Sequence, residues 1–176
     1  MRTGTCNATT VEIRPERPGD EDAIHAVTTA AFLAAPHTGH TEQYIVRELR
    51  RAGQLTVSLV AVQDGTVVGH VAISPVTIDD GTRGWFGLGP LSVSPQHQGL
   101  GIGSRLVREA LQQLRALGGK GCVLVGEPAY YARFGFRAEP QLVLPGVPPA
   151  YFQAVCFETP APAGVVTFHK AFDATA

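Results

Sequence analysis

Three glycines, at positions 99, 101 and 103, lie directly between a strand-like segment and a helical one. From Ser104 to Leu117 the apolar residues recur at the spacing of a helix, and Gly118 ends the pattern. The next segment, 121–126, is short and almost wholly apolar, which is typical of a buried strand in a parallel pair. Strand, helix and strand in this order form a βαβ crossover, so we expect two parallel strands in one sheet.

The strand before the glycines, 85–94, contains three residues that weaken a regular hydrogen-bonded ladder: Gly87, Gly89 and Pro90. Such residues inside a strand often mark a bulge. We therefore expect an irregular strand just ahead of the glycines.

The rest of the chain predicts further strands, at least two of them antiparallel, beside this crossover. Asp64-Gly65 stands between two β-branched runs, which is a strong hairpin signal. Other segments have the pattern of strands at 10–16, 151–157 and 164–172, and of helices at 18–32, 41–53 and 128–134, with a loop at 140–149. The fold class is thus α/β of the α+β type, with a central mixed, mostly antiparallel sheet flanked by helices.

Composition narrows the class of protein. With 176 residues, 44% of them hydrophobic and 16% charged, we expect one domain over residues 1–176. The net charge is −1 and the basic residues are scattered, so neither nucleic acid nor an anionic membrane surface is an expected partner. The start, MRTGTCNATT, has no apolar core of a signal peptide, and no apolar run approaches ~20 residues. We expect a cytoplasmic protein.

The cysteines give no support for a disulfide framework or a metal site. Cys6, Cys122 and Cys156 are odd in number, lie far apart and form no C-x-x-C pair. We expect reduced thiols and no bound metal.

The glycine cluster has a direct chemical interpretation. A helix N-terminus carries unpaired backbone N–H groups and the positive end of the helix dipole, and glycines allow a bulky anion to approach. The spacing suits a pyrophosphate, although a flexible strand-to-helix connection is the simpler alternative. No Gly-Lys-Ser/Thr follows, which excludes a P-loop, and the antiparallel strands ahead exclude the Rossmann fingerprint.

Two motifs together resemble one known family. Gln98 to Gly103, QGLGIG, resembles the acyl-CoA-binding motif of the GNAT N-acetyltransferases, Gln/Arg-x-x-Gly-x-Gly/Ala. YYARFGF resembles a later motif of that superfamily, in which a tyrosine stands four residues before Gly-Phe. The element order from Val11 to Phe136 also follows the family, and VVGHVAISPVTI with EPAYYARFGF further resembles its bacterial YhbS-like subgroup. The resemblance implies a GNAT fold, in which the parallel strand pair is splayed.

The resemblance also implies a donor and a reaction. Acetyl-CoA would be the cosubstrate, and a primary amine would attack its thioester directly through a tetrahedral intermediate, without an enzyme nucleophile. Main-chain groups of the irregular strand would hold the pantetheine arm and the thioester carbonyl, and the glycine loop would cradle the pyrophosphate with Gln98 beside it. The implied binding residues are Leu91, Ser92, Val93, Gln98, Gly99, Leu100, Gly101, Ile102, Gly103 and Ser104.

Tyr131 matches the family's general acid, which protonates the departing thiolate. The alternative is that Tyr130, Tyr131, Phe134 and Phe136 are packing residues. Neighbouring helical side chains point about 100° apart, so we expect at most one of the two tyrosines to face the pocket.

The general base has three candidates. A primary amine with a pKa near ~10 is mostly protonated at neutral pH, so a carboxylate, a histidine or a water chain must accept a proton. Glu42, His70 and Glu127 are the candidate residues. Each also has a structural interpretation: an exposed first-turn carboxylate, a half-buried hydrogen-bonded histidine, and a helix cap, respectively.

A second class of function stays open at this stage. A GNAT fold can bind acyl-CoA as a non-catalytic sensor or assembly module. If the chain is an enzyme, its acceptor is a small-molecule amine or a protein amino group, chosen by the second helix and residues 140–157. A closing strand with a free edge could also form a homodimer.

Overall fold

The computed structural model describes residues 9–158 and 160–176, so Cys6 and most of the N-terminal segment considered above lie outside the described residues. In this described part, eight strands form one mixed sheet in the order β1-β2-β3-β4-β5-β7, and β8 joins β3 and β6 beside this path. The strands are β1 (Glu12–Pro15), β2 (Val57–Gln63), β3 (Thr66–Ile78), β4 (Trp85–Val93), β5 (Gly121–Val125), β6 (Leu142–Val143), β7 (Phe152–Cys156) and β8 (Gly164–Phe168). The pairs β4–β5 and β6–β8 are parallel and the other pairs antiparallel, which confirms the predicted mixed sheet.

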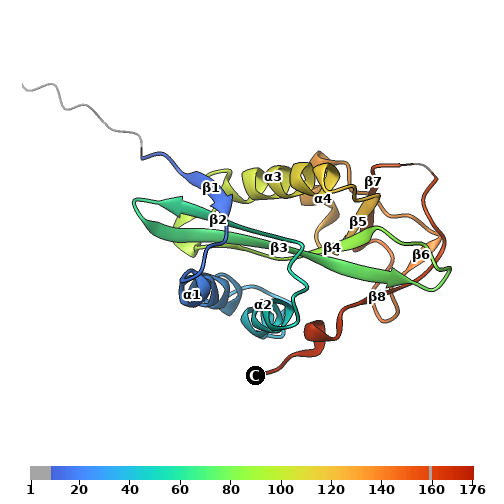
Figure 1. Cartoon of the computed structure of the whole chain (residues 1–176), viewed down its shortest axis with the longest axis horizontal. Helices are drawn as coiled ribbons and strands as arrows, with labels where there is room; N and C mark the ends of the chain where they lie inside the picture. Colours follow the sequence, from blue (N-terminus) through green and yellow to red (C-terminus); the bar gives the residue numbers. More distant parts are fainter. Residues whose placement is uncertain (1–8, 159) are drawn as a thin grey trace, which may run out of the picture.

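Helices cover both faces of this sheet (Figure 1). Helices α1 (Glu21–Leu33) and α2 (Glu42–Arg51) lie on one face, where Ile24, Val46 and Val60 form a buried cluster. Helix α3 (Ile102–Ala116) lies on the other face. Helix α4 (Pro128–Tyr131) comes close to the first turn of α3, where the Tyr130 hydroxyl approaches Gly103. The apolar stripe predicted for α3 is buried and packs on β2, β3 and β4, because its residues recur every three or four positions: Leu106, Val107, Ala110, Leu111 and Leu114. The crossover β4-α3-β5 is therefore confirmed.

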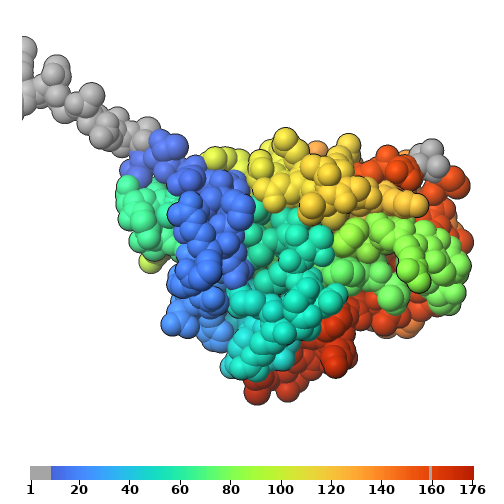
Figure 2. All heavy atoms as spheres, viewed as in Figure 1, coloured from blue at the N-terminus to red at the C-terminus, as the bar shows by residue number. Residues whose placement is uncertain are grey.

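The chain departs from the predicted elements in two regions. The loop at 140–149 contains β6, whose two residues pair with the start of β8 and are too few to show a periodic pattern. The strand expected at 164–172 ends at Phe168, and Lys170–Asp173 form the 3-10 helix η3. His169 caps this turn, since its Nδ1 accepts the N–H of Ala171 at 3.1 Å. Figure 2 shows the C-terminal segment in red against α2, and η3 packs on that helix.

Two further features concern the expected environment of the chain. Within residues 9–158 and 160–176, no helix combines the length and apolar character needed to cross a membrane. In the same residues Cys122 and Cys156 are free thiols, and no group of three His, Cys, Asp or Glu side chains is placed to hold a metal ion.

Candidate functional site

Strand β4 changes partners halfway along its length. Val71 of β3 pairs with Leu91 and Ile73 pairs with Leu88, so Gly89 and Pro90 together face one residue of β3. This is the bulge that the glycine and proline pattern predicted. On its other side, β4 pairs with β5 only from Trp85–Gly121 to Gly87–Val123. Beyond Gly87 the backbone edge that faces β5 is free of ladder hydrogen bonds, which is where a ligand can bind between parallel neighbours.

A first cavity lies where the glycines meet the helix. Gly99 and Gly101 have φ angles of 76° and 81°, a left-handed conformation that glycine adopts without steric cost, and Gly101 is the N-cap of α3. No side chain caps this helix end, so its first N–H groups stay free for a ligand. The cavity has a volume of about 480 Å³. We call it the glycine-loop cavity, and its lining residues are Val93, His97, Gln98, Gly99, Gly101, Ile102, Gly103, Ser104, Tyr130 and Arg133.

Side chains beside the glycines shape this cavity. The Gln98 amide donates to the carbonyl of Val93 at 3.0 Å and so ties the loop to the end of β4. The Nδ1 atom of His97 is buried and has no hydrogen-bond partner among the described residues. The predicted binding residue Leu100 is not among the lining residues, and its side chain is 69% exposed.

Arg133 is a lining residue that the sequence motifs did not single out. Its Cζ lies 4.6 Å from the centroid of the Tyr130 ring, and its Nε donates to the Tyr130 carbonyl at 2.8 Å. The guanidinium thus brings a positive charge to the cavity that the N-terminus of α3 also lines. Its position three residues after Tyr130 in YYARFGF was the available signal.

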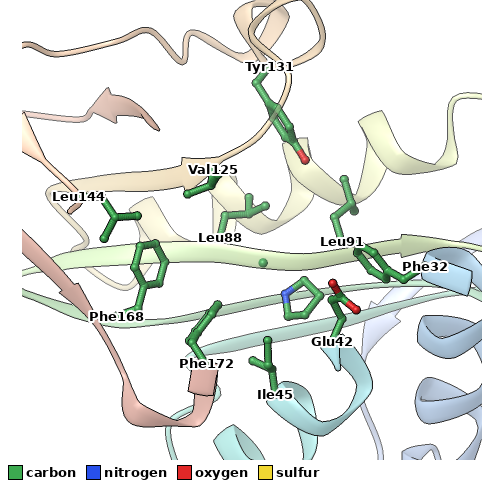
Figure 3. A pocket seen from close by; sticks show the side chains of 12 residues that line it. Phe32, Glu42, Ile45, Leu88, Leu91, Val125, Tyr131, Leu144, Phe168 and Phe172 are labelled. Carbon is green, nitrogen blue, oxygen red and sulfur yellow. The ribbon is translucent and has the colours of Figure 1, made fainter. Parts of the chain in front are cut away.

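A second cavity of about 430 Å³ lies beside the bulge (Figure 3). We call it the apolar cavity, and its lining residues are Phe32, Glu42, Ile45, Leu88, Gly89, Pro90, Leu91, Val125, Tyr131, Leu144, Phe168 and Phe172. Of these, Glu42, Ile45 and Leu144 come from the two regions expected to select the acceptor. The three phenylalanines come from α1, β8 and η3, and sequence reasoning missed them because only tertiary packing brings α1 close to the C-terminal elements β8 and η3.

Tyr130 and Tyr131 separate the two cavities. Their ring centroids lie 4.9 Å apart with ring planes at 89°, and Tyr130 lines the glycine-loop cavity while Tyr131 lines the apolar one. Each tyrosine therefore faces a different cavity, in keeping with the divergence expected of neighbouring helical residues.

The Tyr131 side chain is held by packing around its ring. A β-carbon on Gly126 would collide with the ring, and Phe136 approaches it edge-on at 6.0 Å between centroids. In Figure 3 the hydroxyl points from α4 toward β4. Burial, assisted by the neighbouring Tyr130 hydroxyl, raises the pKa of Tyr131 to about 12, so the hydroxyl is protonated at neutral pH.

Glu42 reaches the same cavity from the opposite helix layer. It is the first residue of α2, and Figure 3 shows its carboxylate beside Phe32. Its Oε2 atom is buried and has no hydrogen-bond partner among the described residues. A carboxylate oxygen without a partner in a cavity is available to a ligand.

His70 belongs to a separate buried network on β3. Its side chain is fully buried, and Nε2 lies 2.9 Å from Ser58 Oγ. Ser58 donates to Glu16, which also forms an ion pair with Arg50 at 2.5 Å. Burial lowers the pKa of His70 to about 4, because the protonated ring would lose its hydration. His70 lines neither of the two cavities.

Glu127 also lies apart from both cavities. It is exposed and stands just before α4, where its backbone carbonyl accepts the N–H groups of Tyr130 and Tyr131. Its side chain makes no capping hydrogen bond. The structure therefore brings together Glu42 and Tyr131 and leaves His70 and Glu127 elsewhere.

Strand β4 runs along both cavities. Leu91 lines the apolar cavity and Val93 the glycine-loop cavity, because residues two apart in a strand share a face. Between them Ser92 turns toward α1 and its buried hydroxyl donates to Thr28 Oγ1 at 3.2 Å. One continuous strand segment thus links a site suited to an anion with a site that holds an acid and a carboxylate.

Comparison with known proteins places this geometry in one family. A sequence profile of the Acetyltransferase (GNAT) family matches residues 22–136. The chain is 39% identical over 126 residues to the uncharacterized N-acetyltransferase YhbS of Escherichia coli K12, covering 71% of this chain and 72% of that protein.

Two solved structures have the same fold over nearly the whole chain. A GNAT family acetyltransferase from Brucella melitensis in complex with acetyl-CoA is 48% identical, with a TM-score of 0.84, covering 94% of this chain and 99% of that one. YhbS from E. coli in complex with CoA is 33% identical, with a TM-score of 0.88, covering 99% of this chain and 98% of that one. The profile match, the identity to these relatives and the splayed parallel pair show that this chain belongs to the GNAT acetyltransferase family.

Proposed function

We propose that the protein transfers the acetyl group of acetyl-CoA directly to a primary amine. The observation that carries this proposal is that Tyr131 and Glu42, whose Oε2 has no partner among the described residues, line one cavity beside the β4 bulge. An acid and a base on either side of a strand that binds a thioester are what such a transfer requires. Family membership and relatives solved with acetyl-CoA or CoA support the donor.

The glycine-loop cavity fits the diphosphate of the donor. Its uncapped helix end offers free N–H groups and the positive end of the dipole, and glycines keep the approach clear of β-carbons. Arg133 adds a positive charge to the lining, and the unpartnered His97 Nδ1 adds a polar contact. With the diphosphate there, the pantetheine arm would follow β4 past Val93 and Leu91 into the apolar cavity.

The proton steps follow from the two polar side chains. Glu42 accepts one proton from the bound ammonium, and the free amine then attacks the thioester carbon to give a tetrahedral intermediate. As the carbon–sulfur bond breaks, Tyr131 donates a hydrogen bond and then its proton to the sulfur. The second proton of the amine nitrogen is released during this collapse and restores the tyrosine. The raised pKa of Tyr131 keeps the donor protonated until charge develops on the sulfur.

Mass spectrometry of purified protein with acetyl-CoA and a panel of small amines, amino acids and lysine peptides tests this proposal. An acetylated product formed by the wild type supports it. CoA binding without any product across the panel contradicts it and favours a non-catalytic acyl-CoA sensor or assembly module. The single domain over 1–176, the cytoplasmic location and a homodimer stay predictions from the sequence.

A further inference from the structure

The apolar cavity has an unusual balance of polar and hydrocarbon groups for a site that accepts a cation. Of the twelve residues that line it, Glu42 and Tyr131 are the two with polar side chains (Figure 3). The other side chains of the lining are hydrocarbon, and three of them are the aromatic rings of Phe32, Phe168 and Phe172. A ligand that fills this cavity is therefore surrounded mostly by apolar surface.

The aromatic end of the cavity is built firmly into the fold. The rings of Phe168 and Phe172 lie 4.9 Å apart between centroids, with planes at 58°. The Phe168 ring lies so close to the backbone of Gly87 that a β-carbon there would collide with it. Phe172 packs against the cluster that contains Ile45 and Leu49 of α2. These contacts fix the rings in place, so the cavity presents a preformed apolar wall.

Charge complementarity limits the ligand to one ammonium group. Glu42 is the single carboxylate among the lining residues, and its Oε2 atom has no partner among the described residues. One ammonium group can pair with it. A second ammonium on the same ligand would lie against hydrocarbon, with no second carboxylate among the lining residues to pair with, and moving a charge from water onto apolar surface is unfavourable.

The size of the cavity sets a further limit. Its volume of about 430 Å³ is near the lower end of the roughly 300–1,000 Å³ of small-molecule sites, and the acetyl end of the donor must share it. A peptide would also bring amide groups, for which the hydrocarbon side chains of the lining provide no hydrogen-bond partners, while the free edge of β4 is taken up by the pantetheine arm.

We propose that the acceptor is a small primary monoamine carried on an apolar body, with an aromatic ring as the best fit. This inference rests on the proposed function. The amine meets Glu42 and the thioester near the bulge, and the apolar body lies between Phe168, Phe172 and Leu144. Polyamines and protein lysines are correspondingly poor acceptors.

Two matched amines test the charge argument. n-Hexylamine and 1,6-diaminohexane have the same chain and differ by one terminal amino group. We expect kcat/KM to be at least ten-fold higher for n-hexylamine, and higher still for 2-phenylethylamine. A kcat/KM for 1,6-diaminohexane, or for a peptide with one lysine and a blocked N-terminus, that equals or exceeds those of both monoamines overturns the inference.

A pair of variants locates the effect at the aromatic wall. Phe172→Asp places a carboxylate across the cavity from Glu42, whereas Phe172→Asn removes the same ring without adding charge. We expect the Asp variant to raise the ratio of kcat/KM for the diamine over n-hexylamine at least ten-fold relative to the Asn variant. Equal ratios in the two variants contradict the placement of the acceptor body. Thermal unfolding and CoA affinity, measured for both, confirm that they remain folded.

Calorimetry separates this inference from the proposed reaction. The four probes are titrated into wild-type protein saturated with CoA, which carries no acetyl group. If both monoamines bind more tightly than the diamine and the peptide, the acceptor class is supported, whether or not product forms. Absence of product in that case contradicts the proposed reaction alone. Product formed mainly from the diamine or the peptide keeps the reaction and overturns the acceptor class. Neither binding nor product with any probe overturns both.

Discussion

The hydroxyl oxygen of Tyr130 lies 2.9 Å from the position that a β-carbon on Gly103 would occupy. Gly103 stands in the first turn of α3, and its φ angle is not among the positive ones. This glycine therefore serves the close approach of α4 to the helix end, whereas Gly101 serves the left-handed turn before it.

The contact predicts a coupling between these two residues. Gly103→Ala pushes the Tyr130 hydroxyl aside and disturbs Arg133, so we expect it to weaken CoA binding by roughly 0.5–3 kcal/mol, the range of coupling between residues in contact. Tyr130→Phe removes the oxygen that the alanine would meet. In that background Gly103→Ala should weaken CoA binding by at least about 0.5 kcal/mol less than in the wild type, which is the smallest coupling usual between residues in contact. Calorimetric CoA affinities of the four proteins give the cycle. Additive effects would contradict the contact.

Gly101 and Gly118 form a matched pair for the anion site. Their φ angles are 81° and 85°, and a β-carbon on either would meet nothing within 4 Å. They flank opposite ends of α3, so a valine at either position strains the backbone similarly, by about 1–2 kcal/mol. We expect Gly101→Val to weaken CoA binding severely and Gly118→Val to leave it nearly unchanged, at comparable losses of thermal stability. Equal CoA affinities of the two variants would show that the glycine loop is not part of the CoA-binding site.

Much of this fold follows from local patterns. Asp64-Gly65, the apolar stripe of α3 and the Gly89-Pro90 bulge each encode an element through its own residues, and each is present in the structure. The helix after the glycine loop is also present, although α3 begins at Ile102, two residues before the predicted start at Ser104.

The walls of the apolar cavity could not be read from the sequence in this way. Phe32 lies far along the chain from Phe168 and Phe172, and each of the three would pass for an ordinary packing residue. For the same reason the sequence could not choose among the three candidates for the general base. What separates Glu42 from His70 and Glu127 is the cavity that its side chain lines, and tertiary structure decides this. Local sequence gives no information about which cavity a side chain lines.

The buried network of His70 predicts a pH-dependent stability. Unfolded, His70 takes up a proton as the pH falls below about 6.5, but in the fold its pKa of about 4 keeps it neutral. The unfolded state is thus favoured as the pH falls from 6.5 toward 4. Burial would raise the pKa of Glu16, but hydrogen bonds from Arg50 and Ser58 outweigh it and lower the pKa, so this carboxyl acts in the same direction at lower pH.

Denaturant unfolding at pH 7 and pH 5 measures this effect. We expect the free energy of unfolding to fall between pH 7 and pH 5, with about 2 kcal/mol of this decrease due to His70. The figure follows from about 1.4 kcal/mol for each pH unit below the pKa of the unfolded state. His70→Gln, which cannot titrate, should show a smaller loss and should keep its turnover per folded molecule. The same pH dependence in both proteins would contradict the buried neutral state, and a lost turnover would return His70 to the candidates for the base.

Glu42→Gln tests the proposed base. Without the carboxylate the acceptor must bind already deprotonated, so kcat/KM at pH 7 should fall by roughly 10²–10⁴-fold. It should then rise more steeply with pH than the wild type, because an amine with a pKa near ~10 supplies more free base. Glu127→Gln changes an exposed carboxylate outside both cavities and should have no effect. A loss in Glu127→Gln with an unchanged Glu42→Gln would exchange the two assignments.

In the proposed acetyl transfer, Tyr131 donates its proton to the departing sulfur of acetyl-CoA. The most direct test compares wild type and Tyr131→Phe for acetyl-CoA affinity by calorimetry and for product formation by mass spectrometry with the best acceptor. We expect the variant to have a kcat lower by roughly 10²–10⁴-fold and a nearly unchanged affinity for acetyl-CoA, since the ring and its packing on Phe136 are kept. A Tyr131→Phe variant with the wild-type kcat would contradict proton donation by Tyr131 and show that the ring serves in packing alone.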